Sequence, residues 1–366
     1  MVVAPDTVKM DAVALQKVKI LFEEQIDEGL HPGAILAVYR HGNLVLDLHG
    51  GIASQETATS VQADTMFVLF SSTKAMTAAC LHILWERGKL SWDDTVAQHW
   101  PGFAKNNKAQ ITIRHILSHQ GGFPETPNEL TWKKWLDWEA VVAAMENITP
   151  EFAPGQVMAY HPRNYGWMIG ELVRRIDGRT FDKFLREEIT APLGMNDTYV
   201  GMPEELESRV AKLHAMEDCD RPGMVTTYNH PGVHQAVQPA GGGIATARDL
   251  ARFYAMMGAG GTLDGVQIMK PNTLREVTQL QVSGLDHTLA QHMRRSLGLV
   301  LADKRMGASD DEGNRTFGHG GAGTSIGWAD PESGLALAFI TNGFRSNQTN
   351  NPRLEAISLA VRKACR

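Results

Sequence analysis

The stretch that decides the fold is Phe67-Val68-Leu69-Phe70-Ser71-Ser72-Thr73-Lys74-Ala75-Met76-Thr77-Ala78-Ala79-Cys80-Leu81. It places the motif Ser-x-x-Lys where an apolar run gives way to a helical pattern. Apolar residues then recur at three- and four-residue steps as far as Leu84, which indicates one buried helix face. The pattern therefore predicts that Ser71 starts a helix and that Lys74 follows one turn later on the same face.

This arrangement of Ser71 and Lys74 is chemically useful. A serine hydroxyl is a weak nucleophile until a neighbouring base takes its proton. A lysine can be that base only when burial or another cation keeps it neutral. The positive end of the helix dipole would also favour negative charge at Ser71. The alternative is that Ser71, Ser72 and Thr73 only cap a helix and that Lys74 is solvated. The motif alone does not choose between the two.

The composition bounds the class of protein. The 366 residues are enough for about two domains and a large core. The contents of 43% hydrophobic and 21% charged residues are ordinary for a soluble globular protein. A formal net charge of −6 argues against nucleic acid or an anionic membrane surface as the main partner. No run approaches eighteen apolar residues, so no transmembrane helix is expected.

The N-terminus and the cysteines both predict a cytoplasmic location. Residues 1–6 lack a basic segment followed by an apolar run, so we expect no secretory signal. Cys80, Cys219 and Cys365 are odd in number and unrelated in spacing. They therefore indicate no disulfide framework and fit a reducing compartment.

Strand patterns occur at the two ends of the chain and helical patterns lie between them. Residues 34–40 and 44–49 predict a β-hairpin across His41-Gly42-Asn43. Short apolar runs return within residues 316–341, and a final helix is predicted from Pro352 to Lys363. Thr131 to Met145 carries an aromatic stripe of tryptophans, which favours packing but also allows a wall over an acyl pocket.

These patterns predict an α/β (α+β) fold. We expect one antiparallel sheet built from both termini and flanked by helices, with an inserted helical domain. Residues 1–70 and 300–366 would form the sheet domain, and residues 71–299 the mainly helical domain. The active site would lie at the interface of the two, where Ser71 begins the insertion.

Other segments match the residue patterns of known catalytic or binding motifs, but each motif also requires a particular structural context. Ser325 lies in Gly-x-Ser-x-Gly, but that elbow needs a helix after it and a later histidine, and no histidine follows. Gly318 to Gly323 fits Gly-x-Gly-x-x-Gly without the helix that a dinucleotide site requires. His115 and His119 are four residues apart, but without the glutamate of a zinc helix, so a structural role is favoured. Cys219 lies among acids that would raise its pKa, a poor setting for a nucleophile.

Three segments together resemble a family. Ser71-Ser72-Thr73-Lys74, the segment from Pro154 to His161 that contains Tyr160, and His319-Gly320-Gly321 are similar to the motifs of serine β-lactamases and penicillin-binding proteins. The strongest resemblance is to family VIII carboxylesterases with the class C β-lactamase fold. It runs from about residue 15 to the C-terminus. No single motif is decisive, but the ordered set is specific.

Two departures from the family pattern bear on the substrate. Class C β-lactamases typically have Tyr-x-Asn, where this chain has Tyr160-His161-Pro162. They also place a lysine, which helps to bind the β-lactam carboxylate, where His319 stands. A mostly neutral histidine is a weaker anchor for a carboxylate, which favours uncharged esters. The lack of a recognisable signal peptide points the same way, because β-lactamases that protect the cell wall are exported.

The resemblance implies a mechanism and a set of residues. Ser71 would attack a small-molecule carboxylic ester, with Lys74 and Tyr160 sharing the role of general base. The backbone N–H groups of Ser71 and Ala322 would form the oxyanion hole, and no cofactor or metal is expected. The expected substrate-binding residues are His319, Gly320, Gly321, His161, Trp132 and Trp135.

Several functions share this scaffold and stay open at this stage. A β-lactamase, a D-amino-acid peptidase or amidase, and an acyltransferase would use the same nucleophile. A non-hydrolytic acyl-binding sensor would differ in holding its acyl group for a long time. The sequence does not give the acyl chain length, the alcohol or the order in which Lys74 and Tyr160 take the proton. It also leaves the oligomeric state open.

Overall fold

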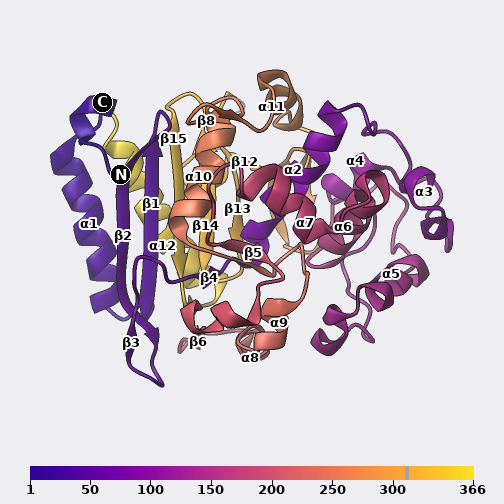
Figure 1. Cartoon of the computed structure of the whole chain (residues 1–366), viewed down its shortest axis with the longest axis horizontal. Coiled ribbons are helices and arrows are strands. Elements are labelled where there is room, and N and C mark those ends of the chain that lie inside the picture. Colours follow the sequence, from indigo (N-terminus) through magenta and orange to yellow (C-terminus); the bar gives the residue numbers. More distant parts are fainter. Residues whose placement is uncertain (310–312) are drawn as a thin grey trace.

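The computed structural model describes residues 1–309 and 313–366. Its central element is a nine-stranded antiparallel sheet to which both ends of the chain contribute (Figure 1). In spatial order the strands are β10 (Val282–Asp286), β11 (Gln291–Arg295), β12 (Val300–Leu301), β13 (Phe317–Gly321), β14 (Ser325–Asp330), β15 (Leu335–Thr341), β1 (Gly33–Arg40), β2 (Asn43–Ser54) and β3 (Thr59–Ser60). The α/β class and the sheet built from both termini are confirmed, because β15 pairs with β1.

The β1–β2 hairpin forms where its turn residues predict it. The two connecting residues, His41 and Gly42, have φ of 48° and 78°. A two-residue loop with both φ values positive matches the right-handed twist of the strands it joins. All eight residues of β1 are buried, because helices cover both faces of the sheet at this point.

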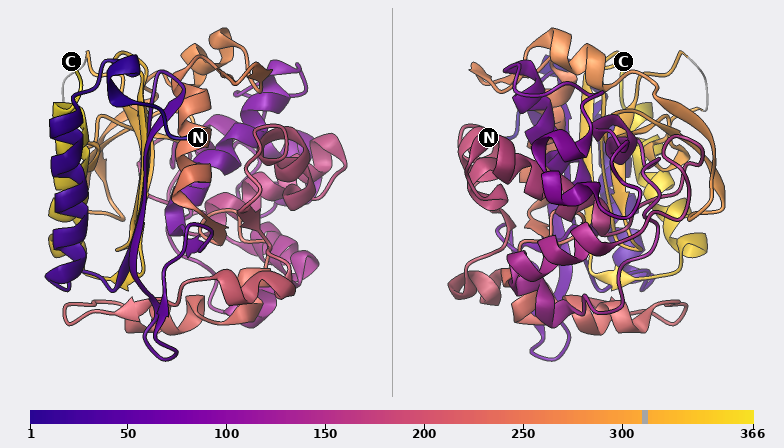
Figure 2. Two further views of the ribbon diagram at one scale, coloured as in Figure 1. Left: turned by 60° about the vertical axis from the view of Figure 1, so that its left-hand side comes forward. Right: turned by 90° about the vertical axis from the view of Figure 1, so that its right-hand side faces the viewer.

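Two helices from opposite ends of the chain cover one face of the sheet. Helix α1 (Ala12–Asp27) packs beside α12 (Asn347–Lys363), and Figure 2 shows the pair as one outer layer. Helix α10 (Ala247–Gly258) lies on the other face, against β1, β14 and β15. Its amphipathic sequence begins at the Thr246 cap, whose side chain accepts the N–H of Asp249 at 3.3 Å.

Most of the other α-helices lie beyond α10, on the side away from α1 and α12 (Figure 2), whereas the short turn η7 (Lys304–Met306) packs against α12. The α-helices are α2 (Thr73–Glu86), α3 (Val96–His99), α4 (Ile113–Leu117), α5 (Trp138–Asn147), α6 (Asn164–Asp177), α7 (Phe181–Leu185), α8 (Pro222–Tyr228), α9 (Pro231–Gln235) and α11 (Pro271–Val277). Short helical turns are η1 (Pro5–Val8), η2 (Phe70–Ser72), η3 (Pro101–Ala104), η4 (Trp132–Leu136), η5 (Arg186–Thr190), η6 (Glu204–Arg209) and η7 (Lys304–Met306). Helix α2 packs against α6 and β13, which places its first turn beside the large sheet.

In the described part of the chain, three small sheets accompany the large one. They are β4 (Phe67–Val68) with β7 (Gly243–Ala245) and β5 (Thr198–Val200), β6 (His214–Ala215) with β16 (Gly343–Phe344), and β8 (Thr262–Leu263) with β9 (Val266–Gln267). The first of these fixes the entry to α2. Leu69 N–H donates to Gly243 O at 2.8 Å, and Gly243 N–H donates to Thr73 Oγ1 at 3.0 Å. The glycine is required there, because a Cβ on Gly243 would overlap the Thr73 side chain.

The sheet uses more of the chain than residues 1–70 and 300–366. Strands β10 and β11 extend it from within the segment 71–299, and α10, from the same segment, covers one face. The division into two domains with those boundaries stays a prediction. Within residues 1–309 and 313–366, no helix combines the length and the apolar character needed to cross a lipid bilayer.

Candidate active site

Ser71 lies in η2, the short turn that leads directly into α2. The residue before it, Phe70, has φ of 48°, in the left-handed region that residues other than glycine rarely adopt. Such a conformation costs on the order of 1–3 kcal/mol and persists only where its surroundings hold it. The Phe70 ring is held by Tyr228 and Phe344, whose centroids lie 4.7 and 5.5 Å away. The turn therefore fixes the position of Ser71 at the edge of a cavity.

Lys74 is fully buried on the first turn of α2, and its Nζ lies 3.2 Å from Ser71 Oγ. The same nitrogen donates to the carbonyl oxygens of Pro162 and Ala240 at 2.7 and 2.9 Å. Burial, together with the nearby arginine charges, holds the pKa of Lys74 well below its usual range. In its neutral form the amine has two hydrogens for the two carbonyl oxygens and a lone pair for the serine hydroxyl. Each N–H and the lone pair thus has a hydrogen-bond partner.

Tyr160 reaches the same point from the loop before α6. Its N–H donates to Asp286 Oδ1 at 3.0 Å, and its carbonyl oxygen accepts from Thr288 Oγ1 at 3.0 Å. The guanidinium of Arg295 lies over its ring, 5.1 Å from the centroid. Burial raises the pKa of Tyr160 to about 12, although a hydrogen bond with Ser71 and the charge of Arg295 oppose the rise. The phenol is therefore protonated at neutral pH and can donate a proton.

Strand β13 and the turn after it form the opposite wall of the cavity. The wall residues are His319, Gly320, Gly321 and Ala322. Ser72 Oγ donates to His319 O at 3.1 Å, which fixes the strand against η2. A Cβ on Gly321 would overlap the carbonyl oxygen of Leu69, so only glycine allows this approach. The backbone after Gly321 is thereby brought to the same cavity as Ser71.

His319 is a neutral side chain in this wall. Its Nδ1 lies 2.8 Å from Gly320 O, and its Nε2 has no partner within residues 1–309 and 313–366. Burial holds the pKa of His319 well below its usual range. The imidazole therefore carries no charge at pH 7, in the place where the resemblance expects a lysine.

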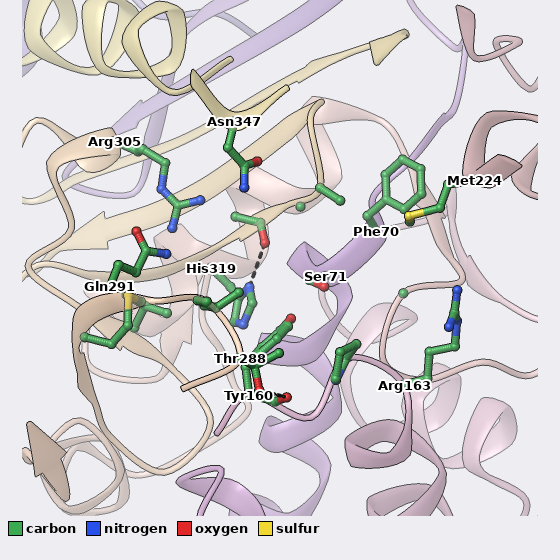
Figure 3. A pocket seen from close by; sticks show the side chains of 18 of the residues that line it. Phe70, Ser71, Tyr160, Arg163, Met224, Thr288, Gln291, Arg305, His319 and Asn347 are labelled. Carbon is green, nitrogen blue, oxygen red and sulfur yellow. Dashed lines mark hydrogen bonds between the residues drawn. The ribbon is translucent and has the colours of Figure 1, made fainter. Parts of the chain in front are cut away.

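The cavity has a volume of ≈340 Å³ and opens beside Ser71 (Figure 3). In Figure 3, Phe70, Met224 and Arg163 lie on one side of Ser71, and Tyr160, Thr288, His319, Gln291 and Arg305 lie on the other. Among the described residues that line it there is no aspartate or glutamate, whereas four arginines contribute: Arg163, Arg221, Arg295 and Arg305. The Ser71 hydroxyl and the Tyr160 phenol thus line a cavity with basic walls, and the buried Lys74 amine lies next to Ser71.

Comparison with known proteins identifies the family of this chain. A model of the beta-lactamase family matches residues 19–362. The chain belongs to the beta-lactamase family. The esterase/beta-lactamase LipL of Mycobacterium tuberculosis is 31% identical to this member over 343 residues, which is 85% of this chain and 77% of LipL.

Two solved structures share the fold of this beta-lactamase family member over nearly its whole length. One is a penicillin-binding protein homologue from Caulobacter crescentus, with a TM-score of 0.88 and 31% identity. The other is a family VIII carboxylesterase, with a TM-score of 0.87 and 27% identity. Each likeness covers 97% of this chain and 98% of the other. The predicted resemblance to β-lactamases, penicillin-binding proteins and family VIII carboxylesterases is therefore confirmed.

Three residues that the sequence predicted to bind substrate do not line the cavity of this family member. The His161 ring is fully buried, with its centroid 5.2 Å from His119 and 5.6 Å from Phe123. The Trp132 ring contacts the His230 ring at a tilt of 40°, with centroids 4.0 Å apart. Trp135 packs beneath the guanidinium of Arg163, 5.3 Å from the ring centroid. None of the three lines the cavity, and their role in binding stays a prediction.

Other residues at the site carried no signal in the sequence. Asp286 and Arg295 form a buried ion pair at 2.8 Å that supports Tyr160 from β10 and β11. Arg163 and Arg305 reach the cavity from positions that no motif marks. Only the fold brings the β10–β11 hairpin, more than 120 residues later in the chain, beside the Tyr160 loop. A single sequence gives no means of finding such pairs.

The competing motifs have structural roles in the beta-lactamase fold. Ser325 is buried, and its Oγ donates to Leu69 O at 2.7 Å. A strand, not a helix, follows it, so the elbow interpretation does not apply. His119 Nδ1 accepts the N–H of His161 at 3.1 Å, and His115 Nδ1 accepts the N–H of Thr112 at 3.2 Å. Both histidines thus complete backbone hydrogen bonds.

Proposed function

We propose that this protein is a serine hydrolase that cleaves carboxylic esters through an acyl intermediate on Ser71. The observation that carries the proposal is the buried Lys74 Nζ, 3.2 Å from Ser71 Oγ, at the edge of a cavity that Tyr160 also lines. The similarity to a family VIII carboxylesterase and to an esterase/beta-lactamase supports ester cleavage within the shared family.

In the proposed acylation step, Ser71 Oγ attacks the ester carbonyl carbon while Lys74 Nζ takes the hydroxyl proton. Lys74 is the first base because its lowered pKa leaves the amine neutral, whereas the raised pKa of Tyr160 leaves the phenol protonated. The carbonyls of Pro162 and Ala240 then accept hydrogen bonds from the ammonium that forms. Their dipoles stabilise the charge that burial would otherwise penalise.

The backbone N–H groups of Ser71 and Ala322 would stabilise the oxyanion, each worth roughly 3–4 kcal/mol of transition-state stabilisation. Tyr160 donates its proton to the departing alkoxide and recovers one from Lys74, whose ammonium lies 4.7 Å from the centre of the Tyr160 ring. Water then attacks the acyl-Ser71 ester, with the same pair acting in the reverse sense. The products of the reaction are the free acid and the alcohol, and Ser71 is regenerated.

An ester is favoured over a β-lactam by His319. The resemblance places a cation there to hold the β-lactam carboxylate, and the neutral imidazole of this chain supplies no charge. Arg305 lies near the same wall, but its guanidinium is paired with Asp303, with Nε 2.9 Å from Oδ1. β-Lactam and amide hydrolysis therefore rank below ester hydrolysis on this scaffold.

The test is hydrolysis of p-nitrophenyl acetate, butyrate and octanoate beside a chromogenic cephalosporin, with wild type and Ser71→Ala. We expect ester turnover that falls at least about 10³-fold in Ser71→Ala, and little cephalosporin cleavage. Fast Ser71-dependent cephalosporin cleavage would instead make the protein a β-lactamase. Ester turnover that survives in Ser71→Ala would overturn the proposal.

Two further arms separate the remaining functions on the same scaffold. A burst of p-nitrophenol followed by almost no turnover would indicate an acyl-binding sensor, because only deacylation would be blocked. Added alcohols that divert most of the acyl group into new ester would indicate an acyltransferase. For a hydrolase, we expect steady turnover and free acid as the main product at modest alcohol concentration.

A further inference from the structure

The four arginines that line the cavity differ in how their charges are balanced. Arg295 pairs with Asp286 at 2.8 Å, Arg305 is held by both oxygens of Asp303, and Arg221 pairs with Asp220 at 3.2 Å. Arg163 has no carboxylate within 4 Å in residues 1–309 and 313–366. The wall near Arg163 therefore carries an uncompensated positive charge.

Arg163 is also held in place before any ligand arrives. Its guanidinium lies over the Trp135 ring, 5.3 Å from the centroid. It also approaches the Tyr228 hydroxyl: burial raises the pKa of Tyr228, and a hydrogen bond with Arg163 opposes the rise. The side chain is half-buried, and its Nε has no partner in the described part of the chain. An ordered, partly dehydrated guanidinium favours an anion, because little side-chain freedom is lost on binding.

The position of Arg163 indicates which part of a substrate it would meet. The leaving alcohol must lie at Tyr160, which donates its proton in the proposed mechanism. In Figure 3 Tyr160 approaches Ser71 from one side, and Arg163 lies with Phe70 and Met224 on the other. The acyl chain of an ester bound at Ser71 would therefore run past the two apolar side chains toward Arg163.

We infer that Arg163 binds a carboxylate at the far end of the acyl chain, so that the preferred substrates are half-esters of dicarboxylic acids. The inference rests on the proposed function and names its substrate class. A carboxylate fits better than a dianion, because one planar guanidinium balances one charge and matches two oxygens. This position of the substrate carboxylate also explains why the cavity has basic walls although His319 is neutral. The carboxylate would lie on the acyl side and not at β13.

The test compares matched methyl esters by pH-stat at pH 7.5. Monomethyl glutarate, adipate and pimelate carry a terminal carboxylate, and methyl pentanoate, hexanoate and heptanoate are their uncharged counterparts. For the best-fitting chain length we expect kcat/KM to favour the anionic ester by about tenfold or more, as a charge-assisted hydrogen bond would give. The preference should shrink at high salt, because a half-buried charge pair is partly screened.

The variants are Arg163→Gln and Arg163→Lys, with Arg221→Gln as the matched control. In Arg163→Gln the anionic-to-neutral ratio of kcat/KM should fall about tenfold or more, and Arg163→Lys should restore part of it. In Arg221→Gln, which removes a cavity arginine already paired with Asp220, the ratio should change by less than about threefold. An equal fall for both esters in Arg163→Gln would overturn the inference, since it would assign Arg163 a structural role.

A further substrate locates the anion and separates this inference from the proposed function. The acetate ester of 6-hydroxyhexanoate carries its carboxylate on the alcohol, and we expect no preference for it over hexyl acetate. A preference for it that Arg163→Gln removes would place the anion on the leaving side and contradict the inference. Ser71-dependent hydrolysis of neutral esters without any anionic preference would refute the inference alone. Hydrolysis that does not depend on Ser71 would refute the proposed function.

Discussion

Burial favours the neutral amine of Lys74, the form that the proposed mechanism requires. The side chain has no exposed surface, and its Nζ is surrounded by two carbonyl oxygens and the Ser71 hydroxyl. Taking an ammonium out of water favours the neutral amine, and the charges of Arg295 and Arg163 act in the same direction. Tyr160 responds oppositely to the same environment, because its charged form is the phenolate. The same burial thus favours the neutral form of both the Lys74 amine and the Tyr160 phenol.

This contrast predicts the pH dependence of the reaction. Lys74 must be unprotonated to act, so kcat/KM for p-nitrophenyl butyrate should rise with pH and level well below pH 10.5. In Arg295→Met one nearby cation is lost, which raises the pKa of Lys74 and moves the rising limb to higher pH. The measurement is the pH–rate profile, corrected for spontaneous hydrolysis. A rate that keeps rising beyond pH 10 would instead identify the Tyr160 phenolate as the base.

Sequence reasoning reached the residues whose signals are local. Ser71 and Lys74 are three apart on one helical pattern, and their approach within 3.2 Å follows from that spacing. Tyr160 and His319 were found only through the family resemblance. Arg163 carried no signal, because the lack of a carboxylate near it among residues 1–309 and 313–366 is a property of the folded chain.

At the scale of elements, the site depends on the close approach of β13 to the turn before α2. A Cβ on Gly321 would overlap both the Leu69 carbonyl oxygen and the Ser325 hydroxyl. We expect Gly321→Ala to separate the two elements and lower kcat at least about tenfold, because a misplacement of 1 Å can cost more than that. Gly223→Ala is the control, since nothing lies within 4 Å of its Cβ. The measurement is kcat for p-nitrophenyl butyrate. Equal kcat values for the two variants would show that the site does not depend on this close approach.

The β10–β11 hairpin supports Tyr160 through one carboxylate. Asp286 accepts the N–H groups of Tyr160, Thr288 and Leu289 and pairs with Arg295. Asp286→Ala leaves Arg295 buried without its partner, so we expect a loss of about 3–5 kcal/mol in the free energy of unfolding. Asp220→Ala removes an exposed pair and should cost no more than about 1 kcal/mol. Urea denaturation measures both, and similar losses would show that the buried pair contributes little.

Element boundaries were less predictable than element types. Helix α12 begins at Asn347, five residues before Pro352, where the sequence pattern placed its start. The segment 347–351 is rich in asparagine, which has weak helix propensity, so its helical state is set by tertiary contacts. The tryptophan segment likewise divides into η4 and α5 at Asp137, whose side chain caps α5.

At the scale of the whole molecule, the two chain termini build the wall that holds the site. Arg353 of α12 is 4% exposed and donates to Thr341 Oγ1 at 2.9 Å and to Gly323 O at 3.2 Å. It also lies 3.2 Å from His31 Nδ1. One side chain thus joins the C-terminal helix, the end of β15, the segment just before β1 and the turn that begins at Ala322.

Loss of this link should lower both stability and activity. Arg353→Met fills the space but leaves several buried acceptors without a donor, so we expect a loss of at least about 2 kcal/mol in the free energy of unfolding. The rate should also fall, because the Gly323 carbonyl anchors the turn beside Ala322. Arg366→Met, which removes an exposed pair with Asp11, should change stability by less than about 0.5 kcal/mol. Thermal unfolding and kcat are measured for both variants. Unchanged stability and kcat in Arg353→Met would contradict the prediction.

The outline of the whole architecture could be predicted from the sequence, but two strands of the sheet were missed. Strand patterns at both ends, with helices between, predicted a sheet that the two termini share, and β15 pairs with β1 as expected. The strands β10 and β11 were missed because Val282–Asp286 alternates only weakly and much of the hairpin is solvent-exposed. Asp286 and Arg295 lie on these two strands, so they were missed with them.

The most direct test of the central claim is to find where the acyl group attaches. Wild type and Ser71→Ala are mixed with p-nitrophenyl acetate, quenched in acid within the first turnovers, digested and analysed by peptide mass spectrometry. We expect an acetyl group on the peptide that contains Ser71 in wild type and none on that peptide in Ser71→Ala. An acetyl group on the peptide that contains Ser325, or one that persists in Ser71→Ala, would contradict the assignment of the nucleophile.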